Sequence, residues 1–215
     1  MGRTYTAEII GPAGSGKSTL TNLLRHDATI KTGLSIWGLS LPLLATGTLL
    51  SLKDLVKLIR RRVFTVEEVK LVIQINALRR LLSRESEKGY RALMMDEGGV
   101  FGLAKLQTSE GGTRSNTWMS GLLNRMAPTL DTVIWLDASD AVLAQRIRER
   151  EKPHRTKHLP DAAIREHLAR YRAAFEQVVA ELTRRNSLKV IRFRTDRESL
   201  EAIAKQILAT SGGQV

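Results

Sequence analysis

Eight consecutive residues near the start of the chain form a pattern that binds phosphate groups. They run from Gly11 to Ser18, read Gly-Pro-Ala-Gly-Ser-Gly-Lys-Ser and satisfy the motif G-x-x-x-x-G-K-[ST] in full. Glycines at these places let successive backbone N–H groups turn toward one phosphate, and the start of a following helix adds partial positive charge. We expect Lys17 to reach the β- and γ-phosphates of a nucleotide and Ser18 to ligate Mg²⁺.

The flanking sequence supplies the context that this motif requires. Residues 4–10 read as a short buried strand, and residues 17–26 are compatible with a helix. A glycine-rich turn that matches the motif by chance is the alternative, and this context argues against it. The residues assigned to nucleotide binding are Gly11, Ala13, Gly14, Ser15, Gly16, Lys17, Ser18 and Thr19.

Two carboxylates follow a second apolar segment. Residues 92–95 read as a buried parallel strand that would deliver Asp96 to the carboxyl edge of the sheet, where ligands bind. Asp96 is the predicted second Mg²⁺ anchor, and a turn residue at the end of a strand is the alternative. Glu97 is the candidate to orient or deprotonate an attacking oxygen, whereas a solvated carboxylate would have no such role.

A basic stretch near residue 150 supplies further candidates. Arg146 and Arg150 are four residues apart and share one face of a predicted helix, and Arg155 follows in a loop with proline and histidine. We expect these three guanidinium groups to neutralise charge on a transferring phosphoryl group. Solvated cations at a helix end are the alternative. No histidine has metal-ligand spacing, so no zinc site is predicted.

The remaining elements alternate between the two types, which predicts an α/β fold with a parallel sheet. Further strands are predicted at 132–136 and 188–193. Helices are predicted at 65–88, 115–127, 139–151, 161–185 and 197–209. Thr65 is a plausible helix cap, and the glycines after Asp96 predict a loop.

Length and composition narrow the class of protein. The chain has 215 residues, 42% of them hydrophobic, which predicts one domain with a substantial core. It contains no cysteine, which excludes disulfides, thiolate metal sites and a cysteine nucleophile. The first ten residues lack the apolar core of a secretory signal, so we expect a cytoplasmic protein.

The net charge of +12 indicates anionic partners. Residues 53–62 carry two lysines and three arginines against one aspartate, and residues 146–158 carry six cations against two glutamates. Because so much of the charge gathers in two short stretches, a spread-out nucleic-acid face is not required, and nucleic acid is not the expected partner.

The segment 32–52 contains no charged residue and ten large apolar ones. It is long enough to span a bilayer, but three glycines and Pro42 interrupt it. We consider three roles: a buried helical hairpin, an apolar acceptor pocket or membrane-contacting surface, and a self-association face of a homodimer. The cations that follow at 53–62 favour peripheral contact with an anionic membrane.

Taken in order, these motifs resemble the nucleoside monophosphate kinase group, with thymidylate kinase the most similar member. The phosphate-binding loop, Asp96, the strand ending at Asp137 with Arg146 and Arg150 after it, and the segment 194–201 carry the resemblance, which covers most of the chain apart from 32–62. It implies a P-loop NTPase fold with three α/β/α layers, a five-stranded parallel sheet and an Arg-rich lid at 146–158. It also implies Mg-ATP as donor, with the loop around Thr195 beside the adenine.

One departure bears on the acceptor. Thymidylate kinases usually place arginine where this chain has Glu97, and a glutamate suits a hydroxyl acceptor that needs a base. The sequence therefore predicts a Mg-ATP-dependent small-molecule kinase with the acceptor group, hydroxyl or phosphate, left open; nucleosides, nucleotides, sugars and amphiphilic alcohols all fit. A P-loop ATPase switch acting on a protein or membrane, and a nucleic-acid end kinase, are the alternative functions.

Overall fold

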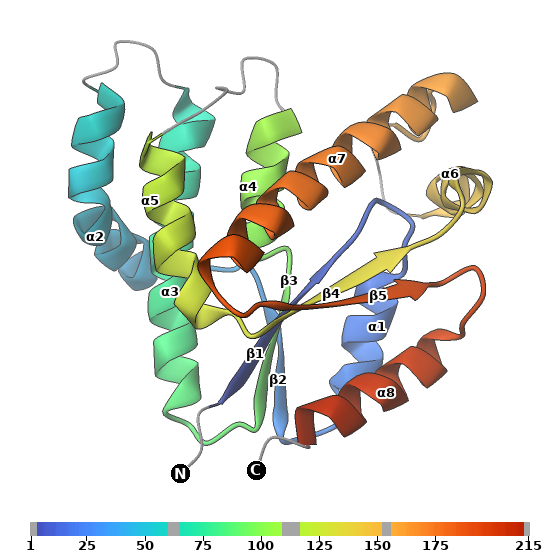
Figure 1. Ribbon diagram of the computed structural model, residues 1–215, viewed down its shortest axis with the longest axis horizontal. Coiled ribbons are helices and arrows are strands. Elements are labelled where there is room, and N and C mark those ends of the chain that lie inside the picture. The colour runs from blue at the N-terminus through green and yellow to red at the C-terminus, as the bar shows by residue number, and fades with distance from the viewer. Residues whose placement is uncertain (1–3, 60–64, 109–116, 152–155, 213–215) are drawn as a thin grey trace.

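Five parallel strands form the centre of the molecule in the order β2-β3-β1-β4-β5 (Figure 1). The computed structural model describes residues 4–59, 65–108, 117–151 and 156–212. The strands are β1 (Tyr5–Ile10), β2 (Ile30–Leu34), β3 (Ala92–Asp96), β4 (Thr132–Asp137) and β5 (Lys189–Arg194). This confirms the α/β class and the five-stranded parallel sheet with flanking helices.

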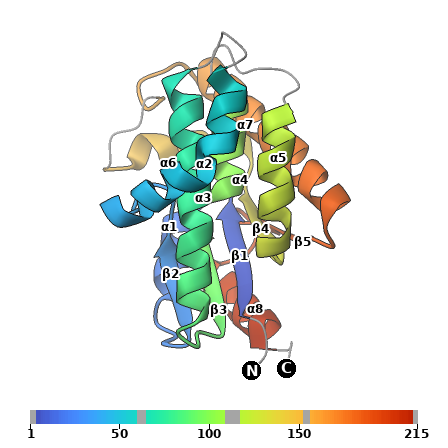
Figure 2. The same ribbon diagram turned by 90° about the vertical axis from the view of Figure 1, so that its left-hand side faces the viewer.

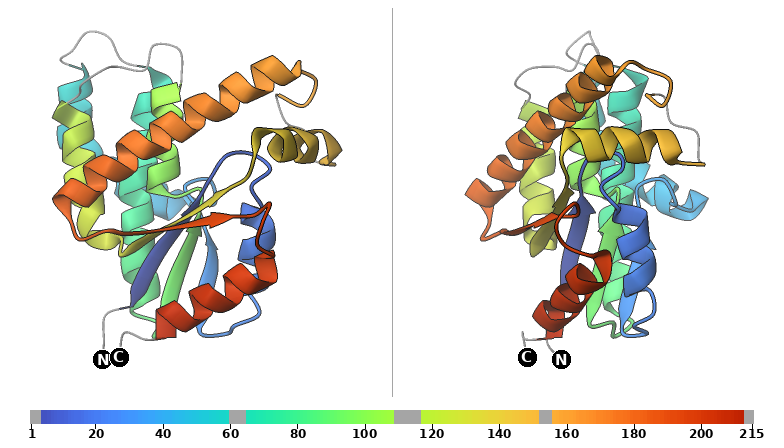
Figure 3. Two further views of the ribbon diagram at one scale, coloured as in Figure 1. Left: turned by 45° about the vertical axis from the view of Figure 1, so that its right-hand side comes forward. Right: turned by 90° about the vertical axis from the view of Figure 1, so that its right-hand side faces the viewer.

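Helices cover both faces of the sheet (Figures 1 and 3). They are α1 (Lys17–Leu24), α2 (Leu41–Ile59), α3 (Val66–Ser86), α4 (Gly99–Thr108), α5 (Thr117–Met126), α6 (Asp140–Glu149), α7 (Asp161–Arg185) and α8 (Leu200–Gly212), with a short 3₁₀ turn at Ala127–Thr129. Helices α1 and α8 share one apolar cluster with the sheet. Helices α3, α4, α5 and α7 share another on the opposite face. The result is a three-layer arrangement.

Side chains of β1 point to alternate faces of the sheet and so contribute to both apolar clusters. Ala7 and Ile9 join the cluster of α1 and α8, whereas Ile10 joins the cluster on the opposite face. All six residues of β1 are buried because both faces of this central strand are covered. The strand can therefore hold the loop that follows it in one position.

Several predicted boundaries are confirmed. Helix α7 has the predicted limits, and α3 begins after Thr65, whose hydroxyl accepts a hydrogen bond from the Glu68 N–H at 3.1 Å. The Glu68 carboxylate in turn accepts from the Thr65 N–H at 2.8 Å, which completes a capping box.

The prediction of a glycine-rich loop after Asp96 is wrong over residues 99–108, which form α4. A Cβ on Gly99 would lie 2.2 Å from the Met126 side chain, and one on Gly102 would lie 2.6 Å from Leu71. These glycines therefore permit close helix packing rather than a loop. Gly111 and Gly112 lie outside the described residues.

The uncharged segment 32–52 does not form a buried helical hairpin, which corrects that reading. It begins within β2, a strand that the sequence did not predict, and continues into α2, which packs on α3. Leu41, Leu49 and Leu52 are exposed. Among the helices in the described part of the chain, none is both long and apolar enough to cross a membrane.

Candidate functional site

The phosphate-binding loop lies between β1 and α1, at the carboxyl edge of the sheet (Figure 3). Gly11 and Gly16 have φ angles of 148° and 92°, and a Cβ on Gly11 would lie 2.1 Å from the Leu136 carbonyl oxygen. Only glycine fits these two positions without strain. The loop therefore has the strand-loop-helix setting that the motif requires.

Lys17 lies folded over this loop. Its Nζ donates hydrogen bonds to the carbonyl oxygens of Gly11 at 2.8 Å and Pro12 at 3.1 Å. Burial lowers the pKa of Lys17, and the nearby carboxylates of Asp96 and Glu97 oppose this effect. The Lys17 ammonium group therefore lies near Asp96 and Glu97, the two acids that the sequence analysis predicted for the site.

A pocket of about 550 Å³ opens above the loop. Its lining includes most of the predicted site residues: Gly11, Ala13, Gly14, Ser15, Gly16, Lys17, Ser18, Thr19, Glu97, Arg146 and Arg150. Sequence reasoning missed the other wall, which consists of Phe101, His167, Leu168, Tyr171 and Leu200. His167 and Tyr171 are four residues apart on α7, with ring centroids 4.9 Å apart, so their helical spacing was a signal that could have found them.

Asp96 ends β3 beside Ile9 of β1. Its Oδ1 is buried and has no hydrogen-bond partner within the part of the chain that the structure describes. Burial raises the pKa of Asp96, Lys17 lowers it and Glu97 raises it further. A buried carboxylate oxygen with free acceptor capacity and the exposed Ser18 hydroxyl fit Mg²⁺.

The described residues contain no group of three or more metal-binding side chains. A Mg²⁺ ion held by Ser18 and Asp96 would therefore take its other ligands from phosphate oxygens and water, as this ion commonly does.

Glu97 has a φ of 59°, in the left-handed region that residues other than glycine rarely adopt. Its carbonyl oxygen accepts a hydrogen bond from the Ile36 N–H at 3.2 Å, and it lines the pocket. Such a backbone conformation persists only where the surroundings enforce it, and it is concentrated at functional sites.

Glu8 of β1 binds the backbone that follows Glu97. Its carboxylate is fully buried and accepts hydrogen bonds from the N–H groups of Val100 at 3.0 Å and Phe101 at 2.8 Å. Burial raises the pKa of Glu8 to about 7, although these bonds and one from Gly98 act in the opposite direction. A Cβ on Gly98 would lie 2.7 Å from the carboxylate. A lone acid in an apolar strand was the signal that sequence reasoning passed over.

Arg146 and Thr195 are joined to each other. Arg146 donates to the hydroxyl and the carbonyl oxygen of Thr195, both at 2.9 Å, and to the Gly14 carbonyl oxygen at 3.3 Å. Thr195 is buried, while Leu200 from the following helix lines the pocket. In this conformation Arg146 connects the phosphate-binding loop to the β5–α8 connection, and Arg150 faces the pocket from the end of α6. Arg155 lies outside the described residues.

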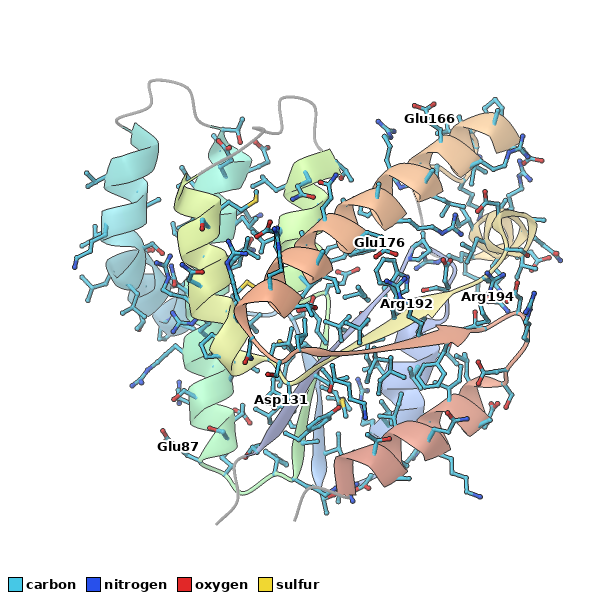
Figure 4. All side chains as sticks on the ribbon, in the orientation of Figure 1. Glu87, Asp131, Glu166, Glu176, Arg192 and Arg194 are labelled. Atoms are coloured by element: carbon cyan, nitrogen blue, oxygen red, sulfur yellow. The ribbon has the colours of Figure 1, made fainter. Side chains whose placement is uncertain are left out.

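Ion pairs fix α7, which carries one wall of the pocket. Arg172 bonds Asp137 at the end of β4 and Asp140 at the start of α6, at 2.9 and 2.6 Å. Further along α7, Glu176 accepts two hydrogen bonds of 2.8 Å from Arg192 of β5, and both residues are labelled in Figure 4. These pairs hold α7 across the sheet beside the pocket.

No protein-family model matches the chain, and no curated protein matches it by sequence. The fold is similar to that of several solved structures, among them two kinases. YorR from Bacillus subtilis, in complex with phosphorylated GDP, is 14% identical with a TM-score of 0.56, and the match covers 95% of this chain and 94% of that one. Shikimate kinase from Bacteroides thetaiotaomicron is 13% identical with a TM-score of 0.53, over 96% and 97% of the two chains. Deoxyadenosine kinase from M. mycoides with bound dCTP is 15% identical with a TM-score of 0.51, over 95% and 99%. The chain therefore has the fold of the P-loop kinases.

Proposed function

We propose that the protein is a Mg-ATP-dependent kinase that transfers the γ-phosphoryl group to a hydroxyl or phosphate of a small molecule. The observation that carries this proposal is the meeting of the phosphate-binding loop and Glu97 in one pocket of about 550 Å³, with Asp96 at the adjoining strand end. A pocket of this size accommodates a small ligand besides the phosphates. The P-loop kinase fold of the solved neighbours, two of which are small-molecule kinases, supports it.

Each side chain has a role that follows from its position. Lys17 and Arg150 place positive charge at the phosphate end of the pocket, where it stabilises a transferring phosphoryl group. Ser18 and Asp96 would hold Mg²⁺, which neutralises phosphate charge when bound. Glu97 can take the proton of an attacking hydroxyl, which favours a hydroxyl over a phosphate as acceptor. Phe101 and Tyr171 form an aromatic wall that would shield a bound acceptor from water.

The first test is the rate of Mg-ATP consumption with aqueous and lipid extracts of cells added separately. Lys17→Ala should lower the stimulated rate by at least about a hundredfold, because one preorganised donor contributes about that much. Lys205→Ala, which removes an exposed lysine from α8, is the matched control and should leave the rate unchanged.

The outcome also separates a kinase from an ATPase switch. A kinase requires an acceptor, so one of the two extracts should stimulate turnover and yield a phosphorylated small molecule. Turnover that neither extract changes, and that Lys17→Ala still abolishes, would contradict the proposal in favour of the switch. Full activity of Lys17→Ala would remove the catalytic assignment of the loop.

A further inference from the structure

Trp37, Lys70 and Lys105 form a cluster from three separate elements. Trp37 lies between β2 and α2, Lys70 belongs to α3 and Lys105 to α4. The Nζ atoms of Lys105 and Lys70 lie 4.3 and 5.4 Å from the centroid of the Trp37 ring, within the range of cation–π contacts. The ring is 44% exposed, so one part of it is open to a ligand.

The cluster is connected to two residues that line the pocket, Glu97 and Phe101. Ile36, next to Trp37, bonds the Glu97 carbonyl oxygen through its N–H, and its own carbonyl oxygen accepts from Gln74 of α3 at 3.0 Å. Phe101 lines the pocket, and Lys105 follows it by four residues on the same face of α4. Lys105 therefore lies about 6 Å beyond Phe101 along the helix axis.

Within the described ranges, neither lysine has a negatively charged partner. Both are exposed, and neither forms an ion pair with any carboxylate among the residues that the structure describes. Two ammonium groups beside one ring repel each other, and an anion that contacts both would relieve that repulsion. A tryptophan with two cations thus offers an apolar surface for a ring and charge-assisted donors for an anionic group.

We propose that Trp37, Lys70 and Lys105 form a binding subsite for the acceptor, which is a ring compound with an anionic group remote from the oxygen that is phosphorylated. This inference rests on the proposed kinase function. The ring packs on Trp37, the phosphate or carboxylate binds Lys70 and Lys105, and the reacting oxygen lies toward Glu97. A sugar phosphate, a sugar acid and a nucleotide all satisfy this chemistry.

Equilibrium binding measured by calorimetry without Mg-ATP tests the subsite independently of turnover. The probes are matched pairs: glucose against glucose 1-phosphate and glucuronate, and thymidine against thymidine monophosphate. We expect at least one anionic probe to bind at least about tenfold more tightly than its neutral counterpart, as charge-assisted hydrogen bonds predict. Comparing the affinity for glucose 1-phosphate with that for glucuronate shows whether the subsite prefers a phosphate or a carboxylate.

The double variant Lys70→Gln/Lys105→Gln should remove that preference while ATP binding stays unchanged. Lys31→Gln is the matched control, because Lys31 also lies over an aromatic ring, that of Tyr90 at 6.0 Å, but on β2. Lys17→Ala should keep the preference, so a failure of the proposed kinase function would leave this result intact. The proposal would be overturned if both members of every pair bound equally, which includes no binding of any probe. It would also be overturned if the double variant and Lys31→Gln lost the preference for the anionic probe equally.

Discussion

A carboxylate inside the sheet binds the backbone that directly follows the two predicted catalytic acids, Asp96 and Glu97. Glu8 lies opposite Met95 in the register of β1 and β3, and it accepts the first free N–H groups of α4. Ordinarily a residue at the helix start caps these groups, whereas here a strand residue does so from more than ninety positions earlier in the chain. The backbone next to Glu97 is therefore bonded to a residue that is not in the lining of the pocket.

This burial makes a prediction about stability and pH. The pKa of Glu8 is about 7 in the folded chain, against 4.5 for an ordinary glutamate. Between these values the folded protein binds a proton that the unfolded chain has lost, so the contribution of Glu8 to stability falls as pH rises from 4.5 to 7. Over this pH range the contribution of Glu8 to the free energy of unfolding falls by about 3 kcal/mol in total.

Urea denaturation of the wild type and Glu8→Gln across this pH range measures the effect. The free energy of unfolding of the wild type should fall relative to that of Glu8→Gln as pH rises, because glutamine does not titrate. Glu166→Gln, at an exposed position of α7 labelled in Figure 4, controls for the change in net charge. Parallel curves for wild type and Glu8→Gln would contradict the assignment.

The site was predictable where its residues are contiguous. The run from Gly11 to Ser18 and the pair Asp96-Glu97 are local patterns that can be recognised without knowing the fold, and both line or adjoin the pocket. Glu8 and the wall of α7 were not predicted, because their relation to the site depends on which strands pair and where a helix lies across the sheet. Arg146 was predicted to face phosphate, but its donors also reach Thr195, a partner that sequence spacing does not reveal.

At the scale of elements, close packing explains secondary structure that the helix and strand propensities of the residues did not predict. Helix α4 was predicted as a loop because Gly98, Gly99 and Gly102 are poor helix formers. Its stability comes from burial against neighbouring helices and from the Glu8 carboxylate. Strand β2 was missed because it lies at an edge of the sheet and contains the exposed Gly33 beside two half-buried positions, which breaks the apolar pattern.

A glycine also permits the close packing of α2 on α3. A Cβ on Gly47 would lie 2.6 Å from the Ile73 carbonyl oxygen and 2.7 Å from the Ala77 Cβ. Beside it, the buried Ser51 hydroxyl bonds the Gly47 carbonyl oxygen at 2.6 Å and accepts from Asn76 at 2.9 Å. The two helices therefore approach each other most closely at a residue without a side chain.

Gly47→Ala should destabilise the protein by about 1–3 kcal/mol, because the steric cost of overpacking exceeds the gain in helix propensity. Gly38→Ala is the matched control: no atom lies within 4 Å of its would-be Cβ, so a change within about 0.5 kcal/mol is expected. The midpoint of urea denaturation measures both. A more stable Gly47→Ala would show that α2 and α3 separate easily at this point.

At the scale of the whole molecule, exposed apolar surface is concentrated on one side. Of eight large exposed apolar side chains among the described residues, six lie between positions 37 and 56. Figure 2 shows α2 as the outermost helix on this side, in front of α3. Leu49, Leu52 and Val56 follow one another at helical spacing, and Lys53 is exposed among them.

The net charge of +12 favours one of the two partners, an anionic membrane or a second copy of the chain, that the sequence analysis considered for this surface. Two copies of so basic a chain repel each other, whereas an anionic bilayer attracts the chain and accepts its apolar side chains. We therefore predict that the protein cosediments with vesicles containing phosphatidylserine at low ionic strength. Binding should weaken in high salt and on vesicles of phosphatidylcholine alone, because the attraction is screened or absent.

The double variant Leu49→Gln/Leu52→Gln should reduce this binding severalfold, since each residue offers apolar area to the bilayer. Leu159→Gln removes another exposed leucine, one that lies between α6 and α7, and should bind as the wild type does. Because all three leucines are exposed, none of these changes should alter the urea midpoint. Vesicle binding unaffected by the double variant would contradict the prediction. A concentration-dependent dimer that the double variant abolishes would instead assign this face of α2 to a second copy of the chain.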